Sequence, residues 1–157
     1  MADWLRIRNL GFSYGEKKII DRFSFTAPVP GIVTCSGPSG CGKSTLGLLL
    51  SGHLTAQSGE IFLDENAVRR PSRRCIAVSQ DDDLFPWMKM RDQLKFCASF
   101  PNTVADWGNL AKSLGMEAFE DLYPGEMSGG MRKRLALLRA TVLMPRLLVL
   151  EIGRAHV

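Results

Sequence analysis

The sequence predicts an α/β fold with a parallel sheet, and three observations indicate it. Residues 37–45 fit the pattern G-x-x-x-x-G-K-[ST] at every fixed position. They are preceded by the β-branched apolar residues 31–35, typical of a buried strand, and followed by residues 46–50, apolar on every face like a buried helix. Residues 147–150 are four consecutive apolar residues, as in a central strand of a parallel sheet. A strand, a glycine-rich turn and a helix in this order form a phosphate-binding loop.

The residues of this loop suit the phosphates of a nucleotide. The glycines let successive backbone N–H groups point inward, the start of the helix adds a partial positive charge, and Lys43 adds a full one. Ser44 is placed to put its hydroxyl on Mg²⁺. A glycine-rich turn that only caps a helix has no use for Lys43, so we predict that the motif holds the β- and γ-phosphates. The predicted contacts are Gly37, Pro38, Ser39, Gly40, Cys41, Gly42, Lys43, Ser44 and Thr45.

The composition limits the other functions open to the chain. Its 157 residues suit one domain, and 45% of them are apolar, as in a globular protein. The net charge of +4 is modest and the basic residues form separate clusters, so nucleic-acid binding is permitted but not indicated. No apolar run approaches the roughly 20 residues of a membrane span, so we expect any membrane link to come through a partner. Four cysteines without C-x-x-C spacing indicate free thiols in a reducing cytosol.

The N-terminal third predicts two strands before the phosphate loop. Residues 4–10 alternate apolar and basic side chains, as a half-exposed strand does, and residues 11–15 are expected to turn. Residues 19–26 then predict a second strand. Tyr14 lies just upstream of the nucleotide loop, where its ring could stack on a purine; the alternative is an aromatic residue at the rim without that role.

The next elements lead to a second polar position. We expect the helix of the phosphate loop to stop near Ser51, residues 60–63 to form a short strand, and residues 69–74 to be a solvated basic loop. Residues 75–80 predict a buried strand that ends in Gln80, at the sheet edge where ligands bind in α/β proteins. The Gln80 amide oxygen can reach Mg²⁺ or water, although a polar strand end without that role is the alternative.

An aromatic segment and several helices follow. Residues 84–88 place a dense aromatic patch beside three aspartates, which favours contact with another protein; a small core under the next helix is the alternative. Residues 90–100 predict a helix, and residues 103–122 predict one or two short helices broken at Gly115.

A second glycine-bearing anion site opens the last helix. Ser128, Gly129 and Gly130 precede a helix whose apolar face and terminating proline are well marked. A single phosphate loop has no use for a second such turn, so we expect this one to bind the same γ-phosphate from another copy of the molecule. A well-capped helix start is the alternative. The predicted apolar face consists of Met131, Leu135, Leu138 and Val142.

Together, the phosphate loop, Gln80 and the serine-glycine turn resemble the nucleotide-binding subunit of ATP-binding cassette (ABC) transporters. The resemblance covers residues 4–150, and the combination is far more specific than any one motif. By position, Tyr14 is similar to the adenine-stacking aromatic residue, Gln80 to the Q-loop glutamine, and the turn at Ser128 to the signature loop. The resemblance implies ATP and Mg²⁺ as cofactors. It assigns catalytic roles to Lys43 and Gln80 and metal binding to Ser44 and Gln80.

The resemblance also implies a domain plan and partners. It predicts an ABC-type cassette over residues 1–150, with a RecA-like parallel-sheet core, an N-terminal antiparallel β part and a helical subdomain at about residues 84–130. Importers for nitrate, sulfonate, taurine or thiamine precursors are the most similar class. The implied partners are a second ATPase subunit, permease subunits that contact Phe85 and Trp87, and indirectly a periplasmic solute-binding protein. The implied location is the cytoplasmic face of the inner membrane.

The C-terminus departs from the family pattern. Where the family has Asp followed by the catalytic Glu, this chain has Glu151 and Ile152, and isoleucine cannot act as a base. Residues 151–157 resemble a translated DNA-sequencing adapter, so we expect a truncated fragment that binds ATP without efficient hydrolysis. Met131 also stands where the signature usually has Gln.

Two other classes remain as alternatives. A DNA-associated ABC-type ATPase usually carries long insertions, whereas residues 44–127, only 84 residues, separate Lys43 from Ser128. A small-molecule kinase with a phosphate loop leaves the turn at Ser128 unexplained.

Overall fold

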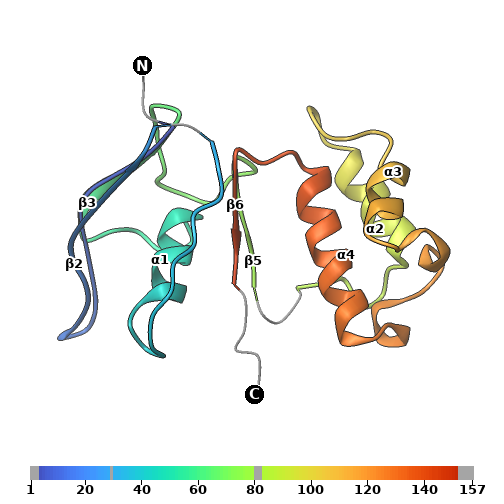
Figure 1. The fold of residues 1–157 in the computed structure, drawn as a ribbon, viewed down its shortest axis with the longest axis horizontal. Coiled ribbons are helices and arrows are strands. Elements are labelled where there is room, and N and C mark those ends of the chain that lie inside the picture. Colours follow the sequence, from blue (N-terminus) through green and yellow to red (C-terminus); the bar gives the residue numbers. More distant parts are fainter. Residues whose placement is uncertain (1–3, 29, 80–82, 152–157) are drawn as a thin grey trace. The chain divides into compact units, whose positions relative to one another are not determined.

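The computed structural model of the protein describes residues 4–28, 30–79 and 83–151. The chain forms two compact units, Met1–Ala77 and Val78–Val157, and Figure 1 shows their elements in chain order. The first unit consists mainly of strands with one helix, and the second unit holds most of the helices.

An antiparallel sheet of four strands dominates the first unit. Its order is β2-β1-β3-β4, with β1 at Leu5–Tyr14, β2 at Lys17–Ala27, β3 at Ser58–Leu63 and β4 at Asn66–Ala67. Leu5 lies opposite Ala27 on one side and Leu63 on the other, so β1 is the central strand of the three long ones. The predicted N-terminal antiparallel part is therefore confirmed.

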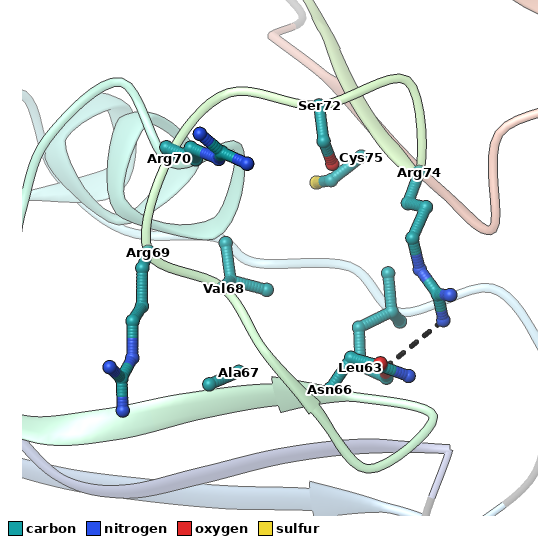
Figure 2. Close-up of a pocket in the computed structure, with 9 residues that line it drawn as sticks. All are labelled: Leu63, Asn66, Ala67, Val68, Arg69, Arg70, Ser72, Arg74 and Cys75. Carbon is teal, nitrogen blue, oxygen red and sulfur yellow. Dashed lines mark hydrogen bonds between the residues drawn. The ribbon is translucent and has the colours of Figure 1, made fainter.

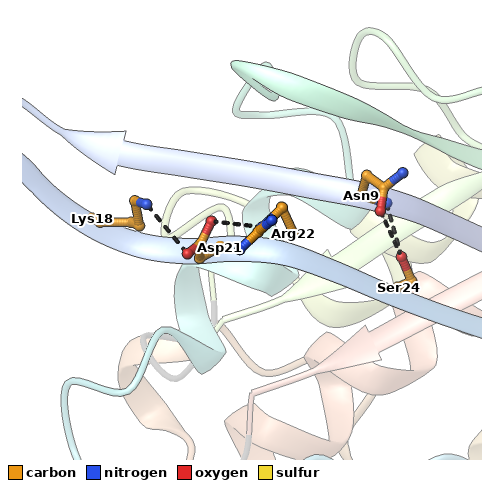
Figure 3. Close-up of polar contacts among 5 residues, drawn as sticks. All are labelled: Asn9, Lys18, Asp21, Arg22 and Ser24. Carbon is orange, nitrogen blue, oxygen red and sulfur yellow. Dashed lines mark hydrogen bonds and ion pairs between the residues drawn. The ribbon is translucent and has the colours of Figure 1, made fainter.

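The expected turn at residues 11–15 is wrong, because β1 continues to Tyr14. The turn begins at Gly15, whose φ is 57°. Gly11 instead permits close approach of β3, since a Cβ added there would collide with Ser58 Oγ. The pairing of β1 with β2 shifts register near Asn9, where the Asn9 N–H donates to Ser24 Oγ at 2.9 Å (Figure 3). Asn9 tolerates its φ of 47° because asparagine is among the residues that adopt the left-handed region.

The other polar contacts in Figure 3 lie along β2. Asp21 pairs with Lys18 at 3.2 Å and with Arg22 at 3.8 Å, and all three side chains are at least half exposed. Exposed ion pairs of this kind add little stability.

The apolar residues 31–35 do not form the predicted strand. They have no regular structure, and the Ile32 side chain is 98% exposed. A strand of a parallel sheet needs a hydrogen-bonded neighbour, and none of the described strands pairs with this segment. The helix that follows the phosphate loop is confirmed as α1, Lys43–Leu50, but only Thr45 and Leu49 within it are buried, so it is not apolar and buried on every face as predicted.

The second unit has a helical core. Helices α2 (Met90–Ala98), α3 (Gly108–Ser113) and α4 (Gly129–Val142) are joined by the 3-10 turns η1 (Glu117–Phe119) and η2 (Pro124–Glu126). The predicted helices and the break at Gly115, whose φ is 64°, are confirmed. The buried side chains of this core are Met90, Leu94, Cys97, Ala111, Met116, Met127, Leu135, Leu138 and Val142.

Strands β5 (Cys75–Val78) and β6 (Leu147–Leu150) form a two-stranded parallel sheet. The backbone pairing continues from Glu151 N–H to the Val78 carbonyl at 3.0 Å. The predicted strands are confirmed, but the central position expected of β6 is not found among the described strands, and Leu150 is 47% exposed. The described part of β6 has β5 as its one neighbour, whereas a fully buried strand needs neighbours and covering layers on both sides.

The described helices are also unsuited to a bilayer. In residues 4–28, 30–79 and 83–151, none is both long enough and apolar enough to span a membrane.

Candidate functional site

The phosphate loop of the first unit has the backbone that its glycines predict. Gly40 and Gly42 have φ values of 78° and 99°, in the left-handed region that strains other residues. The Gly42 carbonyl accepts from the Leu46 N–H at 2.8 Å, which starts α1 immediately after the loop. The N–H groups at the start of α1 therefore face the loop, where a helix favours an anion.

Lys43 folds back over this loop. Its Nζ donates to the Gly37 carbonyl at 2.8 Å and to the Pro38 carbonyl at 2.7 Å, and it lies 3.6 Å from Cys41 Sγ. The ammonium group is thus held over the turn by two uncharged backbone carbonyl groups. In these bonds only the ammonium is charged, whereas a phosphate group also carries negative charge and attracts the ammonium more strongly, so phosphate can replace these carbonyls.

The strand pair β1–β2 supports the loop directly. A Cβ added at Gly42 would lie 3.0 Å from Ile19 Cγ2, so the loop packs closely against the start of β2. Tyr14 is in the same hairpin, opposite Lys17. Its ring is 50% exposed and packs edge-on against Phe12, with the ring centroids 4.9 Å apart. The exposed part of the ring is available to a stacked base.

The predicted magnesium ligands are only partly described. Ser44 is exposed on the first turn of α1, next to Lys43, and its hydroxyl fits an octahedral ion that keeps several waters and phosphate oxygens. Gln80 lies outside the described residues. Among the residues that are described, no group of three or more histidines, cysteines or carboxylates could hold a metal.

The serine-glycine turn of the second unit has an open surface. Ser128 is the N-cap of α4, and its Oγ accepts from the Met131 N–H at 3.3 Å. All three residues of the turn are exposed, and a Cβ added at Gly130 would meet no atom within 4 Å. The packing within this unit does not require a glycine at position 130. Such a glycine is useful where a ligand or another backbone approaches.

The aromatic segment after Gln80 forms a stable turn. Gln93 of α2 is fully buried. Its Oε1 accepts from the Phe85 N–H at 3.3 Å, and its Nε2 donates to the carbonyls of Phe85 at 3.0 Å and Met88 at 2.9 Å. Phe85 stacks on Trp87 with the centroids 5.7 Å apart, and Trp87 is 73% exposed. We call residues 83–88 the aromatic turn.

Arg139 connects this aromatic turn to α4. Its guanidinium carbon lies 4.4 Å from the centroid of the Phe85 ring, and its Nη1 donates to the Asp83 carbonyl at 2.8 Å. Its Nε is buried and has no hydrogen-bond partner among the described residues. The roles of Arg139 and Gln93 were not predicted, because both depend on contacts between residues that no local motif relates.

The four cysteines are all free thiols, as expected, and they divide by exposure. Cys35 and Cys41 are exposed, whereas Cys75 and Cys97 are buried. Burial raises the pKa of Cys75 to about 12. Burial also raises the pKa of Cys97, against the smaller opposing effects of the charge and hydrogen bond of Arg139.

The structure describes these features within separate units. The phosphate loop and Tyr14 belong to the first, and the turn at Ser128, the aromatic turn and Arg139 belong to the second.

The ABC transporter family matches residues 20–151. The chain belongs to the ABC transporter family. The predicted ABC-type cassette fold is thereby confirmed, and nothing in the matches favours the DNA-associated ATPase or the kinase.

Relatives of known role are similar over most of the chain. The spermidine/putrescine import ATP-binding protein PotA of Chromobacterium violaceum is 35% identical over 94% of this chain and 43% of its own length. The taurine import ATP-binding protein TauB of Rhizobium johnstonii is 36% identical over 84% of this chain and 52% of its own. The ABC chain thus spans about half the length of these relatives.

A solved structure shows the same fold at lower identity. CbiO1 from Clostridium perfringens, described as part of the ABC transporter complex cbiONQ, superposes with a TM-score of 0.79 at 22% identity. The match covers 96% of this chain and 65% of that one.

Proposed function

We propose that this chain is part of the ATP-binding subunit of an import-type ABC transporter. The phosphate loop carries the proposal, because Lys43 is held over its turn by two backbone carbonyls that phosphate oxygens can replace. The relatives PotA and TauB are import ATP-binding proteins, which supports the same role here.

In this proposal the residues of the loop bind ATP, and the ring of Tyr14 stacks on adenine. The backbone N–H groups between Gly37 and Thr45, except at Pro38, which has none, bind the β- and γ-phosphates together with the ammonium of Lys43. Ser44 and Gln80 would hold Mg²⁺, whose charge helps to neutralise the phosphates during transfer to water. Lys43 and Gln80 act on the reacting γ-phosphoryl group, the first by stabilising charge and the second by orienting the ion or the attacking water.

The second anion site acts across a dimer. Ser128, Gly129 and Gly130 of one copy bind the γ-phosphate held by the other copy, so that ATP closes two subunits face to face. This explains why the glycine surface of the turn is open in the single chain. Ile152 stands where the family has its water-activating Glu, so we expect the chain to bind ATP and not to sustain hydrolysis.

The aromatic turn is the proposed contact with the permease. Trp87 is an exposed aromatic side chain on a turn that Gln93 and Arg139 hold in shape, a combination that suits a protein interface. In this arrangement the subunit lies on the cytoplasmic face of the inner membrane, and a periplasmic solute-binding protein delivers the solute to the permease.

A nucleotide-binding measurement tests the proposal. Lys43→Ala removes the charge over the loop and is expected to weaken binding of a fluorescent ATP analogue by at least about tenfold, as loss of a charge-assisted contact does. Lys18→Ala is the control, because Lys18 is exposed and its ion pair with Asp21 lies on the surface. Equal affinity of the two variants would contradict the proposed site.

A further inference from the structure

The first unit contains a pocket that is separate from the phosphate loop. It has a volume of about 460 Å³ and lies between β4 and the loop that leads to β5 (Figure 2). Small-molecule sites commonly have volumes of about 300–1,000 Å³, so the pocket has the size of a ligand site. No residue of the motif at 37–45 lines it.

The floor of the pocket is apolar. Leu63 and Cys75 are almost completely buried, and Val68 is partly buried beside them. Burial keeps the Cys75 thiol neutral, with its pKa raised to about 12, so this sulfur presents an uncharged and weakly polar surface. An apolar group placed here would lose its contact with water.

The rim of the pocket is strongly basic. Arg69, Arg70 and Arg74 line it, and Figure 2 shows Arg69 and Arg74 on opposite sides. Arg74 donates to Asp64 at 3.3 Å and to the Leu63 carbonyl at 3.4 Å. In contrast, neither Arg69 nor Arg70 forms an ion pair with any carboxylate of the described residues. Two guanidinium groups therefore stand beside an apolar floor without a neutralising partner.

The backbone that carries these arginines is fixed. Gly52, just after α1, has a φ of 76°, and a Cβ added there would lie 2.5 Å from the Arg70 carbonyl carbon. The loop thus rests directly on the end of α1. The Val68 N–H donates to the Ile61 carbonyl at 2.8 Å, and the Cys75 N–H donates to the Ser72 carbonyl at 3.2 Å. A fixed loop reduces the conformational entropy lost on binding.

We propose that this pocket binds a small organic anion, with its carboxylate or phosphate group at the guanidinium of Arg69 or of Arg70, which point away from each other (Figure 2), and its apolar part on Leu63, Val68 and Cys75. Guanidinium groups bind both kinds of anion through paired hydrogen bonds, and an apolar floor selects anions that carry an apolar group. The site goes beyond nucleotide binding and does not depend on it.

The test uses phenyl phosphate, benzoate and inorganic phosphate, titrated by calorimetry at low salt. The 157-residue chain carries Lys43→Ala, so that anion binding at the phosphate loop is weakened first. We expect phenyl phosphate or benzoate to bind at one site, at least about fivefold more tightly than inorganic phosphate, because the phenyl ring is buried on the floor. Comparison of phenyl phosphate with benzoate shows whether phosphate or carboxylate is preferred.

Variants of the rim assign the site. Arg69→Gln with Arg70→Gln is expected to weaken binding of the preferred probe at least about tenfold, since it removes both guanidinium groups that can make the charge-assisted contact. Lys18→Gln with Arg22→Gln removes the same charge from exposed positions of the same unit and is expected to have little effect. All the changed side chains are exposed, so the urea midpoints of the two double variants should agree.

Three results would overturn the proposal. They are the absence of saturable binding of both aromatic probes, equal affinity for inorganic phosphate and the aromatic probes, and equal loss of affinity in the two double variants. A failure of Lys43→Ala to weaken ATP binding would instead contradict the proposed function and leave this pocket unaffected.

Discussion

Cys41 is a reactive group inside the phosphate loop. Its sulfur is exposed and lies 3.6 Å from Lys43 Nζ. A modified sulfur would occupy the space over the turn that the phosphates need. The rate at which the Cys41 thiol is modified can therefore report whether a nucleotide occupies the loop.

Alkylation tests this geometry. We expect modification of Cys41 by N-ethylmaleimide to reduce affinity for an ATP analogue at least about tenfold, because the adduct blocks charge-assisted contacts with phosphate. Bound ATP should slow the modification. The Cys35→Ser variant isolates Cys41 as the exposed thiol, and Cys41→Ser is the control that should keep its affinity after treatment. Full modification with unchanged affinity would contradict the site.

Cys75 makes stability depend on alkaline pH. Its folded-state pKa of about 12 is higher than the ordinary value of 9.0, so the unfolded chain releases its proton first as pH rises. The stabilising contribution is complete below pH 9 and is lost progressively between pH 9 and about 12.

The corresponding measurement is urea unfolding with reductant at about pH 8 and about pH 10.5, on the two sides of the thiol titration. We expect Cys75→Ala to lose less unfolding free energy between these pH values than the unmodified chain does. Cys35→Ala should show the same loss as the unmodified chain, because Cys35 is exposed. Identical pH dependence in all three proteins would show that the buried thiol is not the cause.

At the scale of elements, local sequence patterns predicted the positions of helices and turns more reliably than they predicted the burial of strands. The phosphate loop and the capped start of α4 depend on neighbouring residues, and their positions were correct. The burial of β6 and the strand at residues 31–35 depend on covering layers and strand neighbours, which the apolar residues themselves do not specify. The contacts of Arg139 were missed for a related reason, since 54 positions separate Arg139 from Phe85 (139 − 85 = 54).

The core of α4 offers a quantitative test of this difference in burial. Leu138→Ala removes a fully buried side chain and should lower the unfolding free energy by about 2–5 kcal/mol. Leu150→Ala makes the same chemical change where the side chain is 47% exposed, and we expect a cost below about 1.5 kcal/mol. Urea denaturation measures both. Equal losses would show that β6 is more deeply buried in solution.

At the scale of the whole molecule, the two proposed anion sites lie in different units, with the phosphate loop in one and the turn at Ser128 in the other. The proposed dimer assigns both sites to one ATP held between two copies. The contributions of Lys43 and Ser128 can then be tested separately, by changing Lys43 in one copy and Ser128 in the other.

Mixing two defective proteins tests this arrangement. Lys43→Ala and Ser128→Glu should each fail to dimerise with ATP and Mg²⁺ in sedimentation velocity, the second because its carboxylate repels the γ-phosphate. A one-to-one mixture restores one composite site, with Lys43 from one protein and Ser128 from the other, and should form dimers. The unmodified chain is the positive control. A mixture that stays as monomeric as its components would contradict binding across copies.

The bridge made by Arg139 has a mechanical consequence. Helix α4 begins at the turn of Ser128, and one turn from its other end Arg139 is bonded to Asp83 and packed on Phe85. A rotation of α4 about its axis would move Arg139. The hydrogen bond to Asp83 and the contact with Phe85 would then act on the backbone next to Trp87. One continuous helix therefore links the serine-glycine turn, through Arg139, to the loop that carries Trp87.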